Sequence, residues 1–154
     1  RSSAFPAIFM ADRGYESYNT FAHIEQKGDK YVVRGRESGT GICSGLNLPD
    51  TEEYDIEKEL YICKKHSKKV KTNPRKYKRI RSDATFDFFT DDCEEYRLNL
   101  RIVKIKLSET TTEVLFTNLS KEEFSADDLK RLYHMRWGIE TAFDQCAWRC
   151  ICSF

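Results

Sequence analysis

Apolar and polar positions along the chain alternate with two different periods, which predicts a mixture of strands and helices. Residues 7–11 (AIFMA) form a short apolar run typical of a buried strand, and the turn residues Asp12, Arg13 and Gly14 follow it. Helical spacing then relates the side chains of residues 18–25, and Gly28 stands where helices commonly end. The sequence therefore predicts a strand and a helix within residues 1–29.

The middle of the chain, residues 30–118, has a strand-like pattern without helical periodicity. Val103, Ile105 and Leu107 alternate with lysines, as in an antiparallel strand with one solvated face. We predict a β-rich insertion domain here, with a glycine-rich open loop near its start. Its candidate strands are residues 31–36, 60–63, 85–89, 97–107 and 112–117.

A third part, residues 119–145, is predicted to contain an amphipathic helix. Ser125 and Asp128 have the spacing of a capping box, which satisfies the unpaired N–H groups of a first helical turn. The apolar stripe that would face the core consists of Leu129, Leu132, Ile139 and Phe143. Residues 146–154 form an atypical tail, and the fold class expected for the whole chain is mixed α/β (α+β).

Composition limits the classes of protein to which the chain can belong. With 154 residues, 40% of them hydrophobic and 13% aromatic, the chain can bury a real core, which excludes disorder over most of its length. We find neither an apolar run of the ~20 residues that span a bilayer nor the pattern of a signal peptide. We therefore expect reduced thiols and no disulfides from the six cysteines, which are Cys43, Cys63, Cys93, Cys146, Cys150 and Cys152.

Zinc binding by these cysteines is an alternative that the spacing does not favour. Cys63 with His66, or the last three cysteines together, supply sulfur and nitrogen donors. Neither set contains the paired Cys-x2-Cys units typical of structural zinc sites. We therefore interpret these residues as thiols without a metal.

The net charge of +1 hides a strong asymmetry along the chain. The basic segment, residues 64–81, contains ten of the 26 basic residues and no acidic residue. The rest of the chain therefore contains sixteen basic and 25 acidic residues. Such a block suits a polyphosphate backbone, because each cation that neutralises a phosphate releases a counterion. A solvated hairpin tip is the alternative. The ten cations are Lys64, Lys65, Lys68, Lys69, Lys71, Arg75, Lys76, Lys78, Arg79 and Arg81.

The predicted C-terminal helix also carries candidate chemistry. Tyr133, Arg136 and Glu140 are spaced i, i+3 and i+7, so that all three project from one side of a helix. The carboxylate can coordinate a hard divalent cation while the guanidinium and the phenol hold a phosphate. The alternative is an ordinary ion pair between Arg136 and Glu140 with Tyr133 in the core. Asp12, at the end of an apolar strand, stands where α/β sheets place ligand-binding groups.

Three motifs in order resemble a known family. Residues 10–15 (MADRGY), 115–119 (LFTNL) and 133–140 (YHMRWGIE) resemble the DDE transposases of bacterial insertion sequences. More narrowly, they resemble the insertion-sequence-four group, which has a Tyr-x2-Arg-x3-Glu-x6-Lys signature. The resemblance implies a partial RNase H-like (retroviral-integrase-like) fold with an inserted antiparallel β-domain, and it covers residues 7–145.

The resemblance also implies roles for individual residues. Asp12 matches the second catalytic Asp and Glu140 the catalytic Glu, and both would hold Mg²⁺ or Mn²⁺, with two ions in an intact member. Tyr133 and Arg136 match the residues that contact DNA phosphate, and Arg13 either contacts phosphate or pairs with a surface acid.

The implied reaction is metal-dependent cleavage and transfer of DNA strands at the ends of an insertion sequence. The partners would be double-stranded DNA, both transposon ends and target, and a second copy of an intact protein as a homodimer. No organic cofactor or membrane is implied, and the expected location is the bacterial cytoplasm, in association with the nucleoid.

Two positions depart from the family pattern. No Asp precedes Asp12, and Ala147 stands where the signature has Lys. We therefore expect an internal fragment of the catalytic domain that is inactive alone. A non-catalytic DNA-binding remnant and an RNase H-like nuclease without strand transfer are the alternative functions.

Overall fold

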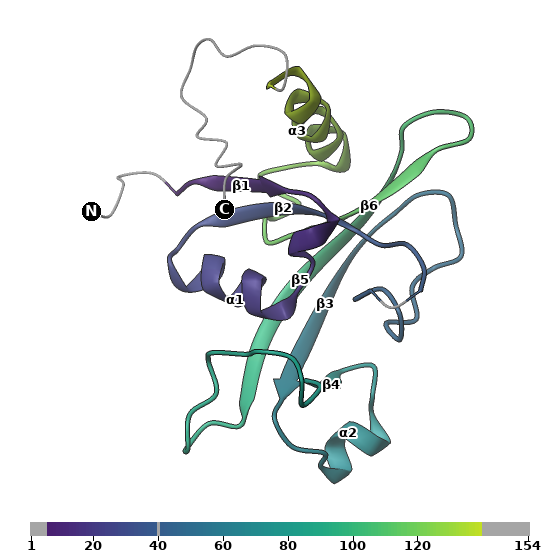
Figure 1. Cartoon of the computed structure of the whole chain (residues 1–154). Helices are drawn as coiled ribbons and strands as arrows, with labels where there is room; N and C mark the ends of the chain where they lie inside the picture. Colours follow the sequence, from purple (N-terminus) through teal and green to yellow (C-terminus); the bar gives the residue numbers. More distant parts are fainter. Residues whose placement is uncertain (1–5, 40, 140–154) are drawn as a thin grey trace.

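The structure, a computed structural model, describes residues 6–39 and 41–139. Its elements confirm the predicted mixture of strands and helices (Figure 1). In chain order they are β1 (Ile8–Ala11), the 3-10 turn η1 (Arg13–Tyr15), α1 (Tyr18–Gln26), β2 (Lys30–Gly35), β3 (Tyr54–Cys63), α2 (Lys68–Thr72), β4 (Tyr77–Arg79), β5 (Glu95–Lys106), β6 (Thr112–Thr117) and α3 (Ala126–Ile139). None of the helices in these ranges has the length and apolar character of a membrane span.

The strands of the described ranges form one six-stranded sheet with the order β1-β2-β6-β5-β3-β4. β1 runs parallel to β2, β4 runs parallel to β3, and the other neighbours are antiparallel. Because β2 pairs with β1, the sheet continues across residue 30, where we predict the insertion domain to begin. The boundaries of that domain stay a prediction.

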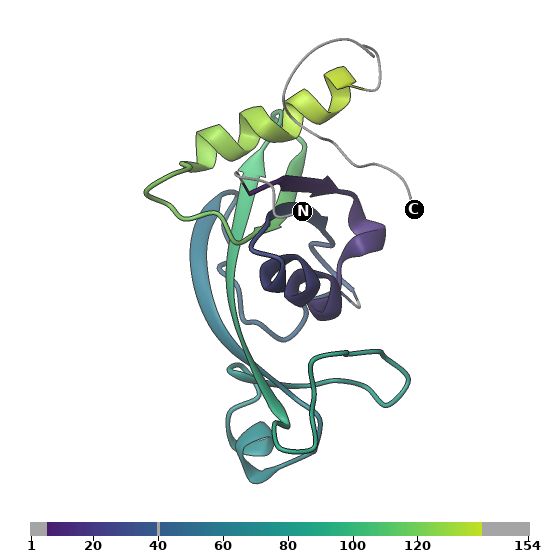
Figure 2. The ribbon, with the colours of Figure 1, turned by 90° about the vertical axis from the view of Figure 1, so that its left-hand side faces the viewer.

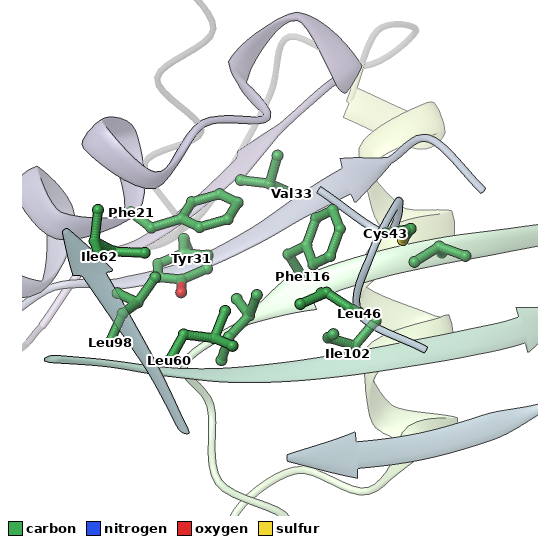
Figure 3. Close-up of a cluster of buried hydrophobic side chains, with 12 residues drawn as sticks. Phe21, Tyr31, Val33, Cys43, Leu46, Leu60, Ile62, Leu98, Ile102 and Phe116 are labelled. Carbon is green, nitrogen blue, oxygen red and sulfur yellow. The ribbon is translucent and has the colours of Figure 1, made fainter. Parts of the chain in front are cut away.

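Each face of the sheet packs against one of the longer helices. In β2, Tyr31 and Val33 face α1, while Val32 points to the opposite face, as the period of two requires. On the α1 side, the Phe21 ring stacks on Tyr31 at 4.6 Å between centroids and contacts Phe116 at 5.7 Å (Figure 3). On the other side, α3 contributes Leu129 and Tyr133 to a second apolar cluster.

The helix ends follow the local signals in the sequence. Gly28 after α1 has a φ of +76°, a conformation that favours glycine. Before α3, the Ser125 Oγ accepts a hydrogen bond from the Asp128 N–H at 3.1 Å, and the Ser125 N–H donates to the Asp128 carboxylate at 2.9 Å. The predicted capping box is confirmed.

The strand prediction for residues 85–89 is wrong, since these residues form turns and irregular backbone. Their aromatic side chains pack against one another and the first core, with Phe86 and Phe89 rings 4.6 Å apart. The Asp87 N–H donates to the Asn19 side chain of α1 at 3.0 Å instead of to a neighbouring strand. Aromatic burial, rather than strand pairing, explains the run of apolar residues here.

Other predicted elements were too short or were absent from the prediction. β3 begins at Tyr54 rather than at residue 60, because its backbone pairs with β5 from Tyr54 onward although four of its first six residues are charged. The short α2 and β4, within the basic segment, were not predicted. Leu129 of the predicted apolar stripe is buried and Leu132 is half-buried, whereas the side chains of Ile139 and Phe143 lie outside the described residues.

A buried arginine joins the sheet to the segment that precedes α3. Arg101 of β5 donates to both carboxylate oxygens of Asp55 in β3, at 2.8 and 2.7 Å. It also donates to the main-chain carbonyls of Leu119 and Phe124, at 3.1 and 2.7 Å. This guanidinium therefore fixes the start of α3 relative to β3 and β5.

Glu25 of α1 gives the protein a predictable dependence on pH. Burial raises the pKa of its carboxyl from 4.5 to about 7, although Lys30 and the Tyr31 hydroxyl act in the opposite direction. Since the folded state then binds the proton more tightly than the unfolded state, stability falls as the pH rises from 4.5 through about 7.

We expect Glu25→Gln to be more stable than wild type at pH 8, by on the order of 1 kcal/mol because solvent screens this partly exposed group. At pH 4, where the wild-type carboxyl is also protonated, the two proteins should unfold within a few tenths of a kcal/mol. Urea unfolding at both pH values measures the difference, and an equal gap at the two values would contradict the expectation.

Candidate active site and nucleic-acid interface

Asp12 stands at the end of β1, with its carboxylate accessible to ligands. Its Oδ1 accepts a hydrogen bond from the Arg13 N–H at 2.9 Å, and its main-chain carbonyl accepts one from the Tyr15 N–H at 3.0 Å. These bonds start the turn η1 directly after the strand. The side chain is 53% exposed, so that the carboxylate is fixed in position and open to solvent.

Two guanidinium groups flank Asp12, and a buried carboxylate holds both. Arg34 of β2 donates through Nε to Glu113 Oε2 at 2.6 Å and through Nη2 to the other oxygen. Arg13 reaches Glu113 Oε2 at 3.2 Å, and Glu113 is buried rather than on the surface. Contact of Arg13 with DNA phosphate stays a prediction. The Arg34 Nη1 lies 3.7 Å from Asp12 Oδ1.

Arg34 and Glu113 were missed in the sequence analysis. The available signal was a charged residue inside each of two otherwise apolar strands, β2 and β6. Such a residue needs a partner when it is buried. Hydrogen bonding to Glu113 raises the pKa of the Arg34 guanidinium further above its ordinary value, with smaller contributions from Tyr133 and Asp12.

Helix α3 covers the face of the sheet on which Arg34 and Glu113 lie. Val32 and Leu115, which belong to the cluster under α3, are two positions from Arg34 and Glu113 respectively, so the side chains share one face. The Tyr133 ring is buried in that cluster, as the alternative of core packing predicts. Met10 of β1, two residues before Asp12, packs against the same cluster, so that α3 lies close to the end of β1.

The predicted spacing on α3 is confirmed as far as the structure describes it. The Arg136 guanidinium carbon lies 5.8 Å from the centre of the Tyr133 ring, so that the two residues share one side of the helix. Glu140 lies outside the described residues. Its approach to Asp12 stays a prediction.

Of the two metal ligands expected from the sequence, Asp12 and Glu140, the structure describes only Asp12. No group of three or more His, Cys, Asp or Glu side chains in residues 6–39 and 41–139 is arranged to hold a metal. Asp12 has the oxygen chemistry that Mg²⁺ prefers, whereas both oxygens of the nearby Glu113 are bound to guanidinium groups. Cys63 donates its thiol to the Tyr61 carbonyl, and Cys43, Cys63 and Cys93 are free.

The basic segment lies beyond the opposite end of the sheet from Asp12. Ile56 shares a cross-strand row with Ala11, through Val33, Phe116 and Ile102. Seven residues further along β3, about 23 Å at roughly 3.3 Å per residue, the strand ends at Cys63 and the segment begins. In Figures 1 and 2, α2 and β4 lie at one end of the molecule and α3 at the other.

The ten cations of the segment divide into two equal sets. The first set has partners in the protein. Four of its members pair with carboxylates: Lys65 with Glu94, Lys69 with Glu95, Lys76 with Glu59 and Arg81 with Asp83. The fifth, Lys78, donates to the Gly45 carbonyl at 2.7 Å. The others are exposed and form no ion pair with any described residue. We call them the unpaired cations: Lys64, Lys68, Lys71, Arg75 and Arg79.

Comparison with known proteins adds the family. The model of the family described as the transposase DDE domain matches residues 1–149, almost the whole chain. A comparison with curated proteins finds none that matches. The mixed α/β architecture, with its six-stranded sheet, is consistent with the family match. The chain therefore belongs to the transposase DDE domain family.

Proposed function

We propose that the chain is a catalytic-domain part of a DDE transposase of the insertion-sequence-four group, with an RNase H-like core. It binds double-stranded DNA and takes part in cutting and joining strands at insertion-sequence ends. The observation that supports this function best is the fixed, exposed Asp12 carboxylate beside two anchored guanidinium groups, under the helix that carries Tyr133 and Arg136.

Within this proposal, the residues around Asp12 have separate tasks. Asp12 and Glu140 hold Mg²⁺ or Mn²⁺, which would supply the charge stabilisation that phosphoryl transfer needs. Arg13 and Arg34 bind the oxygens of a DNA phosphate, since guanidinium groups match phosphate geometry. Glu113 keeps both guanidinium groups in place and limits their repulsion. Tyr133 packs under this site and orients Arg136.

The unpaired cations give the proposed DNA a second point of contact. Measured along the strands, the basic segment begins about 23 Å from the row of Ala11, which corresponds to roughly seven base pairs at about 3.4 Å each. Since β3 also lies four strands across the sheet from β1, DNA that enters both sites must extend at least about seven base pairs beyond the reacting phosphate. Paired cations contribute less, because their carboxylate partners already neutralise them.

Salt dependence of DNA binding tests this function. We expect a fluorescein-labelled 30-base-pair duplex of mixed sequence to bind with a slope of log K against log salt of about −5.4. This counts six phosphates at about 0.9 each, five at the unpaired cations and one at Arg13 and Arg34. Fluorescence anisotropy between 50 and 300 mM NaCl measures the slope. A slope near zero, or no binding at 50 mM, would refute DNA binding through the basic segment.

Product analysis separates the proposed function from its two alternatives. Labelled duplex, supercoiled plasmid and Mg²⁺ are incubated with the chain and analysed on gels. Joined products support a transposase and nicked plasmid alone a nuclease. We infer that this part of a catalytic domain only retards DNA when it is alone, and that Mg²⁺ changes its affinity for DNA. A binding remnant would retard DNA equally with and without Mg²⁺.

A further inference from the structure

Tyr15 is an exposed aromatic side chain three residues after Asp12. It is 44% exposed, and Met135 is the other large apolar side chain in the described ranges with comparable exposure. Within the same ranges, its hydroxyl has no hydrogen bond and its ring contacts no other ring or cation. Most large aromatic side chains here are buried or half-buried instead. The exposure of Tyr15 is therefore unexplained by packing.

The backbone of Tyr15 is held on both sides. Its N–H donates to the Asp12 carbonyl at 3.0 Å, which closes the turn η1 over Asp12. The next residue, Glu16, accepts hydrogen bonds from the main-chain N–H groups of Arg36 and Ile42, at 2.8 and 2.5 Å. The ring is thus presented from a fixed turn rather than from a loose loop.

The neighbours of Tyr15 indicate what its ring contacts. Arg13 in the same turn is anchored on Glu113, with its guanidinium half exposed. Tyr15 follows Arg13 by two residues in the turn η1, so a DNA end whose phosphate is bound by Arg13 would lie close to the turn that carries the ring. Bases stack on exposed aromatic rings when they are outside the double helix, because every base presents a flat π-face.

We infer that Tyr15 stacks on an unpaired nucleobase at a DNA end, beside the phosphate held by Arg13. This inference rests on the proposed function and adds a contact to it. The ligand of the Tyr15 ring is a base that is neither paired nor stacked within the double helix. Fully paired DNA, whose bases stack on one another, gains little from the ring.

The experiment compares two labelled DNAs, a blunt 30-base-pair duplex and the same duplex with a three-nucleotide 3′ overhang that contains 2-aminopurine. Wild-type protein should bind the overhang DNA more tightly than the blunt DNA and quench the 2-aminopurine. Tyr15→Ala should lose about five- to tenfold in affinity for the overhang DNA and the quenching, while its affinity for blunt DNA stays within about twofold. Tyr15→Phe should behave as wild type.

Met135→Ala is the matched control, because it removes a similarly exposed apolar side chain from α3 and should change neither affinity. Equal losses for both DNAs in Tyr15→Ala, or unchanged affinity and quenching, would overturn the inference about Tyr15 alone. Failure of the wild type to bind either DNA would refute the proposed function instead. Thermal unfolding of Tyr15→Ala at the wild-type midpoint excludes misfolding as the cause of a loss.

Discussion

Asp55→Ala should destabilise the protein by about 3–5 kcal/mol, since it leaves the buried Arg101 guanidinium without its carboxylate. Burial of Asp55 alone would raise its pKa, but hydrogen bonds and charge from Arg101, with help from Lys121, lower it overall. The pair therefore stabilises the folded state above pH ~4, and this contribution is lost as the pH falls further. Arg101 also binds the carbonyls before α3, so that the loss should loosen the helix that carries Tyr133.

Asp83→Ala is the matched control for this prediction. Arg81 donates two hydrogen bonds to Asp83, at 3.0 and 2.8 Å, in the same forked geometry. That pair is exposed, so that its removal should cost less than about 1 kcal/mol. Urea unfolding followed by circular dichroism compares the two variants. A similar small change in both would mean that the buried pair does not hold the sheet to the start of α3.

Replacement of all five unpaired cations by glutamine is expected to abolish most DNA affinity. If each cation contacts one phosphate, the slope of log K against log salt should rise by about 4.5, to about −0.9, which is the contribution of the phosphate at Arg13 and Arg34. At ~100 mM salt this corresponds to a loss of roughly a thousandfold or more in affinity. Anisotropy with the 30-base-pair duplex measures both quantities.

The matched control removes two complete ion pairs from the same region. Glutamine at Lys65, Glu94, Lys69 and Glu95 leaves the net charge unchanged, since two cations and two carboxylates disappear together. We expect the affinity to stay within about threefold of wild type. A loss as large as that of the five-cation variant would show that the division into paired and unpaired cations does not describe the interface.

Local sequence rules predicted the elements whose ends depend on neighbouring residues. The capping box at Ser125 and Asp128, the glycine after α1 and the strand at residues 112–117 each follow from a few adjacent side chains. Residues 85–89 contain the same types of residue as a strand. Their conformation depends on Asn19 and on the aromatic side chains that surround them, which come from distant parts of the chain.

In the candidate site, too, local sequence predicted some residues, whereas contacts between distant strands could not be predicted. Asp12 was predicted as a site residue because the sequence shows a single apolar strand and the turn that follows it. The contact of Arg34 with Glu113 joins residues of two antiparallel strands, and their register cannot be seen in either strand alone. The distance between Asp12 and the basic segment depends on the order of the whole sheet. Four of the ten cations are paired because β3, β5 and the adjoining turns bring carboxylates beside them.

The proposed function depends on Asp12 and Glu140 holding one metal ion together. Fe²⁺ bound in place of Mg²⁺ generates radicals, with ascorbate and peroxide, that cut the backbone near the ion. In the presence of duplex DNA we predict two cuts, one near residue 12 and one near residue 140, both lost in Asp12→Asn and in excess Mg²⁺. Mass spectrometry locates the cuts, and a cut near only one of the two residues, or cuts that persist in Asp12→Asn, would contradict the shared site.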